Sequence, residues 1–235
     1  MKIALLGYGR MGKAIEKIAL ERGHQIVYTQ DKEENSGVLS QAEIAINFSI
    51  PEAAVNNIKL SFNHHIPVVC GTTGWLDDYK EICNYCKTKE SGFLYASNFS
   101  IGVNLFFKIN SYVAQLMKAH QKEYTPTLKE IHHIHKLDAP SGTALTLAEG
   151  VLKESHLTDW ELDGSSKDKL SIQSIRKGEV PGTHSISYHS KIDQISIEHE
   201  AFGRDGFALG AVIAAEWLKG KKGVFSMDDV LNIPE

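Results

Sequence analysis

The chain opens with Lys2-Ile3-Ala4-Leu5-Leu6-Gly7-Tyr8-Gly9-Arg10-Met11-Gly12, and this stretch decides the fold of its first half. An apolar strand leads into glycines with the spacing Gly-x-Gly-x-x-Gly, and a helical pattern follows over Lys13–Arg22. Such glycines allow a tight turn and let the backbone approach a pyrophosphate, whose charge the helix start attracts. Asp31 lies 19 residues beyond Gly12, at a strand end, where an acid binds ribose hydroxyls. The alternative is a glycine-rich turn without a ligand, but spacing and context favour a dinucleotide-binding domain.

The first hundred residues alternate between strands and helices. The expected strands are Lys2–Leu6, Gln25–Gln30, Ile44–Phe48, Pro67–Cys70 and Gly92–Ala96. Ser49 and Pro51 predict the N-cap and the first turn of one helix, and another helix is expected over Trp75–Lys89. This alternation is typical of a parallel sheet with helices on both faces.

From Asn104 onward the pattern changes. Apolar residues at helical spacing from Leu105 to Met117 predict an amphipathic helix, and further helices are expected over Thr143–Glu154 and Gly206–Leu218. The expected strands are Leu128–Lys136, Leu170–Arg176, Thr183–His189 and Gln194–Glu200, with a polar connection over Trp160–Lys169. Because short turns join the last three strands, we expect them to pair antiparallel. The predicted fold class is α/β: a Rossmann-type doubly wound parallel sheet, plus a second α+β domain with an open, mostly antiparallel sheet.

Composition excludes several classes of protein. A formal net charge of −4 argues against sequence-independent nucleic-acid binding, and no apolar run approaches the roughly 20 residues that span a bilayer. The N-terminus is a strand followed by glycines rather than a signal peptide. The three cysteines, Cys70, Cys83 and Cys86, do not suit a disulfide framework, and a lone Cys83-x-x-Cys86 inside a predicted helix is expected to be incidental. We therefore expect a cytoplasmic protein that binds neither membrane nor nucleic acid.

Two further loops follow strands of the predicted parallel sheet, at the edge where such sheets bind ligands. They are Gly71-Thr72-Thr73-Gly74 and Ser97-Asn98-Phe99-Ser100. Asp31 favours NADH because it repels a 2′-phosphate, whereas Lys32 and Arg10 could neutralise one, so the prediction is NADH or NADPH, leaning to NADH. The residues expected to bind the cofactor are Gly7, Gly9, Arg10, Met11, Gly12, Asp31, Lys32, Phe48, Gly71, Thr72, Thr73, Ser97, Asn98 and Phe99.

The segment Glu130–Ala144 holds three histidines and a lysine within five positions, then Pro140 and Ser141-Gly142-Thr143 at a helix start. In a regular strand His132 and Lys136 would share one face, and His133 and His135 the other. A metal site at His133-x-His135 and a purely structural cluster are the alternatives. Lys136 opposes a bound cation, so no metal is expected. Proton transfer beside an anion-binding helix start is favoured, because histidine titrates near neutral pH.

The string His132-His133-x-x-Lys136-x-Asp138-Ala139-Pro140-Ser141-Gly142-Thr143-Ala144 resembles the signature of the dihydrodipicolinate reductases, also called 4-hydroxy-tetrahydrodipicolinate reductases. The resemblance extends in order through the two loops named above and through Arg176-x-Gly178, Pro181-Gly182-x-His184 and Phe202-x-Arg204. It covers nearly the whole chain. The chain departs from the family in its short Lys32–Gln41 segment and its compact glycine loop, which puts contacts with the adenosine end of the cofactor in doubt.

The resemblance implies reduction of a cyclic dicarboxylate to tetrahydrodipicolinate by NADH or NADPH in diaminopimelate and lysine biosynthesis. It implies that His132 and Lys136 are catalytic, and that His133, Ser141, Gly142 and Thr143 bind the substrate. His133 must then reach the site by a twist or bulge at the strand end, or the pocket must wrap around the edge of the strand. The implied domains are 1–103 with 201–235 for the dinucleotide, and 104–200 for substrate binding and assembly of a homotetramer. An open, apolar sheet face is expected to carry the oligomer contacts.

Two other functions compete with this one. A two-domain dehydrogenase of an aspartate or homoserine type would share the layout but not the cyclic substrate. A nucleotide-sensing binding protein would keep the fold and lose the chemistry. His132 and Lys136 argue against the second, because a binder needs neither.

Overall fold

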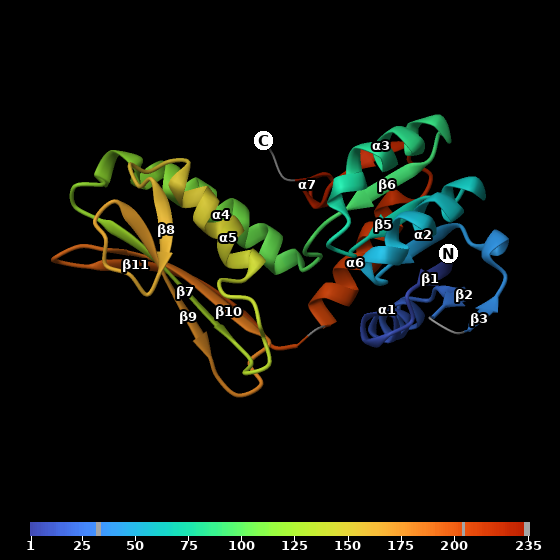
Figure 1. The fold of residues 1–235 in the computed structure, drawn as a ribbon, viewed down its shortest axis with the longest axis horizontal. Coiled ribbons are helices and arrows are strands. Elements are labelled where there is room, and N and C mark those ends of the chain that lie inside the picture. Colours follow the sequence, from blue (N-terminus) through green and yellow to red (C-terminus); the bar gives the residue numbers. More distant parts are fainter. Residues whose placement is uncertain (32–33, 204, 233–235) are drawn as a thin grey trace. The chain divides into compact units, whose positions relative to one another are not determined.

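The structure is a computed structural model that describes residues 1–31, 34–203 and 205–232 (Figure 1). The chain divides into two compact units. Unit 1 comprises Met1–Ile101 and Asp205–Glu235, and unit 2 comprises Gly102–Arg204. The chain therefore leaves unit 1 and returns to it after completing unit 2.

Unit 1 is built on a sheet of seven described strands in the order β12-β6-β5-β4-β1-β2-β3. The strands are β1 (Lys2–Leu6), β2 (Gln25–Gln30), β3 (Asn35–Gly37), β4 (Ile44–Asn47), β5 (Val68–Cys70), β6 (Gly92–Tyr95) and β12 (Gly223–Phe225). Neighbouring strands pair parallel except β2 and β3, which form an antiparallel pair at the edge. The order reverses between β1 and β4, which is where doubly wound sheets open a crevice for a ligand.

Helices cover both faces of this sheet. The helices α1 (Arg10–Glu21) and α6 (Asp205–Leu218) pack on one face, against a core that includes Ile3 and Leu5. The helices α2 (Pro51–Asn63) and α3 (Tyr79–Thr88) pack on the other, around Ala4 and Leu6. Strand alternation accounts for the division, because successive side chains of β1 point to opposite faces. Short helical turns complete the unit: η1 (Leu39–Gln41), η2 (Leu76–Asp78) and α7 (Met227–Val230).

Unit 2 is a five-stranded sheet, among the described residues, in the order β11-β10-β7-β9-β8. The strands are β7 (Thr125–His132), β8 (Asp159–Leu162), β9 (Lys169–Arg176), β10 (Gly182–His189) and β11 (Gln194–Ala201). The longer pairings, β10 with β11 and β10 with β7, are antiparallel, whereas β7 with β9 and β8 with β9 are parallel. The helices α4 (Ile101–Met117) and α5 (Gly142–Leu152) pack on one face, and η3 (Lys118–His120) follows α4.

The predicted fold class is confirmed, and several local predictions are wrong. Ile50, not Ser49, occupies the N-cap position of α2, while Pro51 opens the helix as expected. The polar connection Trp160–Lys169 contains most of β8, because β9 offers that segment an edge to pair with. The strands β9 and β10 are not neighbours, since β7 lies between them.

The open face of the unit 2 sheet is also not the apolar surface expected for oligomer contacts. Polar side chains from three strands, several of them short hydroxyls, line a hollow of about 500 Å³ there. Among them are Thr127, Ser171, Gln173, Ser185 and Ser187. The alternation along β7 and β10 assigns the apolar residues to the helix-covered face, so the other face is left polar.

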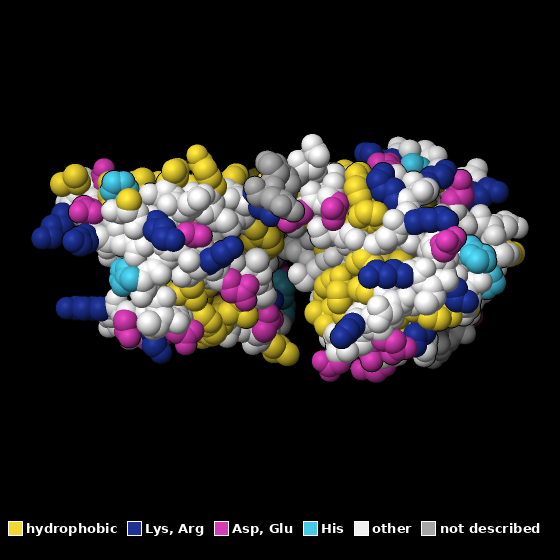
Figure 2. All heavy atoms as spheres, turned by 90° about the horizontal axis from the view of Figure 1, so that it is seen from above, with side chains coloured by type: hydrophobic (Ala, Val, Ile, Leu, Met, Phe, Trp, Pro, Cys, Tyr) yellow, Lys and Arg dark blue, Asp and Glu magenta, His cyan; other side chains and the backbone are white. Residues whose placement is uncertain are grey.

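Two surface properties agree with the composition. Both acidic and basic side chains are spread over the face shown in Figure 2, and the sequence has similar numbers of the two, 29 Asp and Glu and 25 Lys and Arg. Among the described helices, none combines the length and apolar character required to cross a membrane.

Candidate active site

The three glycines after β1 have three different structural roles. Gly7 adopts φ of +102°, a left-handed conformation that favours glycine, and a Cβ there would lie 2.2 Å from the carbonyl oxygen of Phe48. A Cβ on Gly12 would lie 2.2 Å from the carbonyl oxygen of Gly7, so this glycine permits close packing of α1 on the turn. Gly9 is the N-cap of α1, and a Cβ there would meet no described atom within 4 Å. That open position is where a pyrophosphate approaches the backbone in dinucleotide sites.

The start of α1 suits an anion. Arg10 and Met11 form its first turn, which contains no acidic residue, and no side chain caps it. The helix dipole and the amides without intrahelical partners therefore remain available to a phosphate. The helix begins at Arg10 rather than at the predicted Lys13, which brings Arg10 and Met11 into that first turn.

The next strands bring further predicted residues to the same edge of the sheet. Phe48 follows β4, and a Cβ on Gly71, after β5, would lie 2.2 Å from its ring. The Phe48 ring also lies 5.5 Å from the ring of Phe99, which follows β6. The Thr72 hydroxyl accepts a hydrogen bond from the amide of Ser49 at 2.9 Å. Carboxyl ends of parallel strands meet at one edge, so Phe48, Gly71, Thr72 and Phe99 gather there with the glycine turn.

The remaining residues of this group differ in their surroundings. Thr73 and Ser97 are exposed and Asn98 is half-buried, and the Asn98 side chain accepts the amide of Ser100 at 2.9 Å, which shapes the loop after β6. Ser97 precedes it in the same loop. Together they form the rim beyond the buried Phe99.

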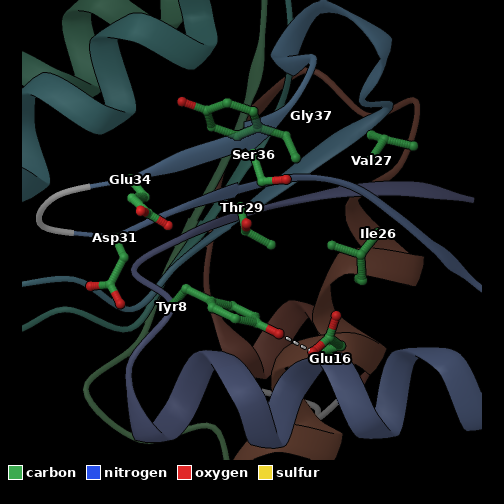
Figure 3. A pocket seen from close by; sticks show the side chains of 10 residues that line it. Tyr8, Glu16, Ile26, Val27, Thr29, Asp31, Glu34, Ser36 and Gly37 are labelled. Carbon is green, nitrogen blue, oxygen red and sulfur yellow. Dashed lines mark hydrogen bonds between the residues drawn. The ribbon is translucent and has the colours of Figure 1, made fainter.

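Asp31 lies on a different side of the turn, where a cavity of about 770 Å³ opens beside α1 (Figure 3). Glu16, Asp31 and Glu34 line it, and the Tyr8 hydroxyl donates a hydrogen bond to Glu16. The β2–β3 hairpin replaces the usual crossover helix after β2, so this part of the sheet face is left uncovered. Lys32, also predicted to contact the cofactor, lies outside the described residues.

In unit 2, the predicted catalytic segment begins at the end of β7. Glu130 and His132 alternate with less buried positions and point toward the helix-covered face, where the Glu130 side chain is fully buried and that of His132 is 7% exposed. Glu130 pairs across the sheet with His184 on β10 and with Ser174 on β9, while His132 pairs with Arg176. Five strand positions thus place polar side chains together near the start of α5.

The Glu130 carboxylate makes contacts on all sides. It accepts the backbone amide of Ser141 at 3.1 and 3.2 Å and the Ser174 hydroxyl at 2.6 Å. The nearest nitrogens of His132 and His184 lie 3.4 and 3.6 Å from Oε2. Burial favours the protonated acid, but hydrogen bonds from His184, Ser141 and Ser174 hold the pKa of Glu130 well below its usual range. The carboxylate therefore stays ionised in the interior.

His132 is held in its neutral form at neutral pH. Burial is the main cause that lowers the pKa of His132 to about 4, and the nearby His184, Lys136 and Arg176 lower it further, against the opposing charge of Glu130. Its ring lies 4.9 Å from that of His184, edge to face. His132 must therefore gain a proton before it can donate one, and a negatively charged ligand beside the ring would favour that protonation.

The strand ends at His132. The expected alternation, with His133 and His135 on the face opposite His132 and Lys136, therefore does not apply beyond His132. The carbonyl of His132 accepts the amide of Lys177, and the Lys136 amide bonds to the carbonyl of His133 in a turn. The turn frees His133 from the opposite sheet face, so no bulge within the strand is required. His133 is half-buried, whereas His135 is exposed and lies 3.4 Å from Glu179.

Lys136 and Asp138 form an ion pair in this loop. The Lys136 ammonium donates to both oxygens of Asp138 at 2.8 Å, and its side chain is 22% exposed. The Arg176 guanidinium donates to the backbone carbonyls of Lys136 and Asp138 at 3.2 and 2.5 Å. Arg176 therefore fixes the path of the loop that carries the lysine.

The start of α5 completes the site. Ser141 is its N-cap and accepts the amide of Ala144 at 3.1 Å, while its Oγ also lies 3.1 Å from Nε2 of His184. Gly142 and Thr143 occupy the first two helical positions, whose amides have no partner within the helix. Gly142 is exposed, and a Cβ there would meet no described atom within 4 Å. The helix start can therefore receive a carboxylate.

The structure brings together His132, Ser141 and the loop with Lys136, and it adds three residues that the sequence analysis left out of the site: Glu130, Ser174 and His184. Glu130 left a signal in the sequence, because a residue two positions before His132 on a strand shares its face. The burial of that acid depends on donors from β9 and α5, which are remote in sequence.

A metal ion is a poor fit to this cluster. Glu130, His132 and His184 are the described residues whose ligand-type atoms lie close enough together to hold one. However, Ser141 and Ser174 already donate to the carboxylate, and the Arg176 guanidinium lies 3.6 Å from it. The carboxylate is therefore already hydrogen-bonded and lies beside a positive charge, which disfavours a bound metal cation.

Comparisons with known proteins agree with both units. Residues 1–99 match the family described as dihydrodipicolinate reductase, N-terminus, and residues 102–231 match dihydrodipicolinate reductase, C-terminus. A 4-hydroxy-tetrahydrodipicolinate reductase of Christiangramia forsetii is 52% identical over 99% of this chain and 98% of its own. One of Archaeoglobus fulgidus is 32% identical over 99% of this chain and 100% of its own.

Among solved structures, a dipicolinate-bound dihydrodipicolinate reductase from Paenisporosarcina sp. TG-14 superposes with a TM-score of 0.80. It is 20% identical, and the match covers 100% of this chain and 99% of that one. At this identity the superposition supports the fold.

Proposed function

Since this chain belongs to the dihydrodipicolinate reductase family, we propose that the residues at the end of β7 and the start of α5 carry out its reaction. The enzyme is an NAD(P)H-dependent oxidoreductase that reduces 4-hydroxy-tetrahydrodipicolinate to tetrahydrodipicolinate in diaminopimelate and lysine biosynthesis. The bound nicotinamide supplies a hydride. The protein must bind a dianionic ring, orient it, and provide a proton where negative charge develops.

His132 and Lys136 are the proposed catalytic residues. Charge that develops on the ring requires a proton donor or a positive charge nearby. The Lys136 ammonium, held by Asp138, supplies a fixed positive charge. His132 is neutral in the ligand-free site, and two substrate carboxylates beside it would favour its protonated form.

The substrate carboxylates are proposed to bind at His133, Ser141, Gly142 and Thr143. The amides of Gly142 and Thr143 lie at the α5 N-terminus, where the helix dipole favours an anion. The polar atoms of Ser141 also contact Glu130, Ala144 and His184, so this residue additionally holds the helix start in place. The main support for the proposal is the exposed start of α5 together with the buried, neutral His132 in the same unit.

A coupled assay tests the assignment. The substrate is generated from pyruvate and aspartate semialdehyde by the preceding synthase, and oxidation of the nicotinamide is followed at 340 nm. Lys136→Ala should lower kcat by about 10²-fold or more, the usual contribution of a positioned proton donor, while the Kd for NADH stays near wild type. Loss of NADH binding alone would refute the role of Lys136. Oxidation that does not require the synthase would indicate a different substrate, such as that of an aspartate or homoserine type dehydrogenase.

The cofactor-binding residues are proposed to be those gathered at the turn after β1 and at the ends of β2, β4, β5 and β6. The three glycines fit a dinucleotide, because Gly7 forms the turn, Gly9 is open and Gly12 packs the helix. We propose a preference for NADH, since Glu16, Asp31 and Glu34 make the cavity beside α1 acidic and unfavourable for a 2′-phosphate. Assays with NADH and NADPH side by side test this, and Asp31→Asn should raise the relative rate with NADPH. A wild-type preference for NADPH would contradict it and point to Lys32 or Arg10.

Three further proposals concern organisation. Unit 1 would be the dinucleotide domain and unit 2 the domain for substrate binding and assembly, as the matched families divide the chain at the same region. A homotetramer follows from family resemblance, and sedimentation equilibrium tests it, since a monomeric mass would refute it. A cytoplasmic location accords with the biosynthetic reaction.

A further inference from the structure

Two buried imidazoles face a single carboxylate oxygen in unit 2. Nδ1 of His132 lies 3.4 Å from Oε2 of Glu130, and Nε2 of His184 lies 3.6 Å from the same atom. The Glu130 side chain has no exposed surface, and those of His132 and His184 are 7% and 6% exposed. The reaction as proposed above uses His132 and leaves Glu130 and His184 without a role.

The geometry indicates which nitrogen of His132 carries the hydrogen in the neutral ring. Among the described residues, the buried Nδ1 makes no hydrogen bond, and the Glu130 carboxylate is an acceptor 3.4 Å from it. A carboxylate beside a ring nitrogen favours the tautomer with the hydrogen on that nitrogen. Nε2 is then the nitrogen left for the substrate. It lies on the side of Gly182, where a Cβ would come within 3.2 Å of it.

The charges around His132 also single out Glu130. Lys136, in the loop, and Arg176, on β9, both disfavour the imidazolium, and His184 on β10 opposes it as well. Glu130 acts on His132 in the opposite direction, because its carboxylate favours the imidazolium. Removing its charge would take away this stabilisation of the protonated ring.

We propose that Glu130 is a positioning residue for proton donation: its carboxylate orients the His132 ring with Nδ1–H toward the protein and stabilises the imidazolium that donates from Nε2. The inference rests on the proposed role of His132 as catalytic acid. His184 and Ser174 support the carboxylate from the neighbouring strands, and the Ser141 amide links it to the helix start that receives the substrate. The buried Glu130 carboxylate therefore contacts both the catalytic histidine and the helix start that receives the substrate.

The test is Glu130→Gln, which keeps the shape of the side chain and removes its charge. We expect kcat to fall by about 10²-fold, the scale of general acid catalysis, with the Kd for NADH unchanged. The falling limb of the kcat–pH profile, where His132 loses its proton, should move to lower pH by at least about one unit, because the imidazolium has lost its counter-charge. Glu130→Asp should restore part of the rate and of the profile.

The matched control is Glu198→Gln on β11, an exposed carboxylate of the same sheet that should retain the wild-type rate and pH profile. A wild-type pH profile for Glu130→Gln, with lowered stability alone, would overturn the inference. Should that variant fail to fold, ¹⁵N NMR of the histidine rings in the wild-type protein decides the matter, because a His132 ring carrying its hydrogen on Nε2 at pH 7.5 refutes it directly.

Activity of His132→Gln separates this inference from the function it rests on. Full activity of that variant removes His132 from the mechanism, and the proposed site fails. An inactive His132→Gln together with an unaltered pH profile in Glu130→Gln leaves the site intact and refutes the role of Glu130.

Discussion

Acid should destabilise unit 2 through His132, by an amount that the structure allows us to estimate. The unfolded chain binds a proton at His132 near pH 6.5, whereas burial lowers the pKa of the folded ring to about 4. Between these values the unfolded state binds more protons. The stabilising contribution is therefore complete above about pH 6.5 and is lost as the pH falls toward 4. Between pH 7.5 and 4.5 the wild-type protein should lose about 2 to 3 kcal/mol of unfolding free energy from this one residue.

The assay is urea unfolding at pH 7.5 and 4.5, with hydrogen exchange of the β7 and β10 amides to report on unit 2. His132→Gln cannot gain the proton, so its pH-dependent loss should be smaller than that of the wild type by the same 2 to 3 kcal/mol. Other groups whose pKa is lowered by burial, such as the half-buried His199, titrate in both proteins, so their contributions cancel in the difference. His135→Gln is the matched control, because it replaces an exposed histidine of the adjoining loop. An equal pH-dependent loss in wild type and His132→Gln would refute the reasoning.

Four other predictions follow from the geometry of the two units. Gly12→Ala, which sets a Cβ 2.2 Å from the carbonyl oxygen of Gly7, should cost about 1–3 kcal/mol in urea unfolding. Gly9→Ala should keep wild-type stability and lose NADH affinity in a fluorescence titration. Ser141→Ala removes the N-cap of α5 and should destabilise unit 2 by about 1–2 kcal/mol, measured by hydrogen exchange. Pyridine-2,6-dicarboxylate should bind with net proton uptake at pH 6, detected by calorimetry in two buffers, and His132→Gln should abolish that uptake.

Local sequence signals were sufficient where local physics decides the structure. The glycine turn after β1 is required by steric contacts of the backbone itself, since Gly7 adopts positive φ and Gly12 packs against it. The strands β1 and β2 have the predicted bounds because each is a short apolar run ended by turn residues. The N-cap role near Ser141 was likewise readable, because a hydroxyl followed by an apolar helical pattern commonly begins a helix.

Strand pairing determined the features of unit 2 that the local sequence did not predict. Trp160–Leu162 carries no strong strand pattern, yet it forms part of β8 because the edge of β9 is available to it. The strands β9 and β10 are linked by a short turn, but β7 pairs with both and separates them. Extended backbone was expected to continue to Lys136, whereas β7 ends at His132 and the Lys136 amide donates to the carbonyl of His133 in a turn.

The same dependence on remote partners explains why Glu130 escaped a sequence-based assignment while His132 did not. A histidine beside a lysine and a helix start has recognisable chemistry without knowledge of its neighbours. An acid on a strand, by contrast, is normally exposed, because burying its charge without partners is costly. Glu130 becomes buried and ionised only through donors supplied by β9, β10 and α5. The fold brings those donors together from three segments that are remote in sequence. The local sequence around Glu130 therefore does not reveal that its carboxylate lies buried beside the His132 imidazole.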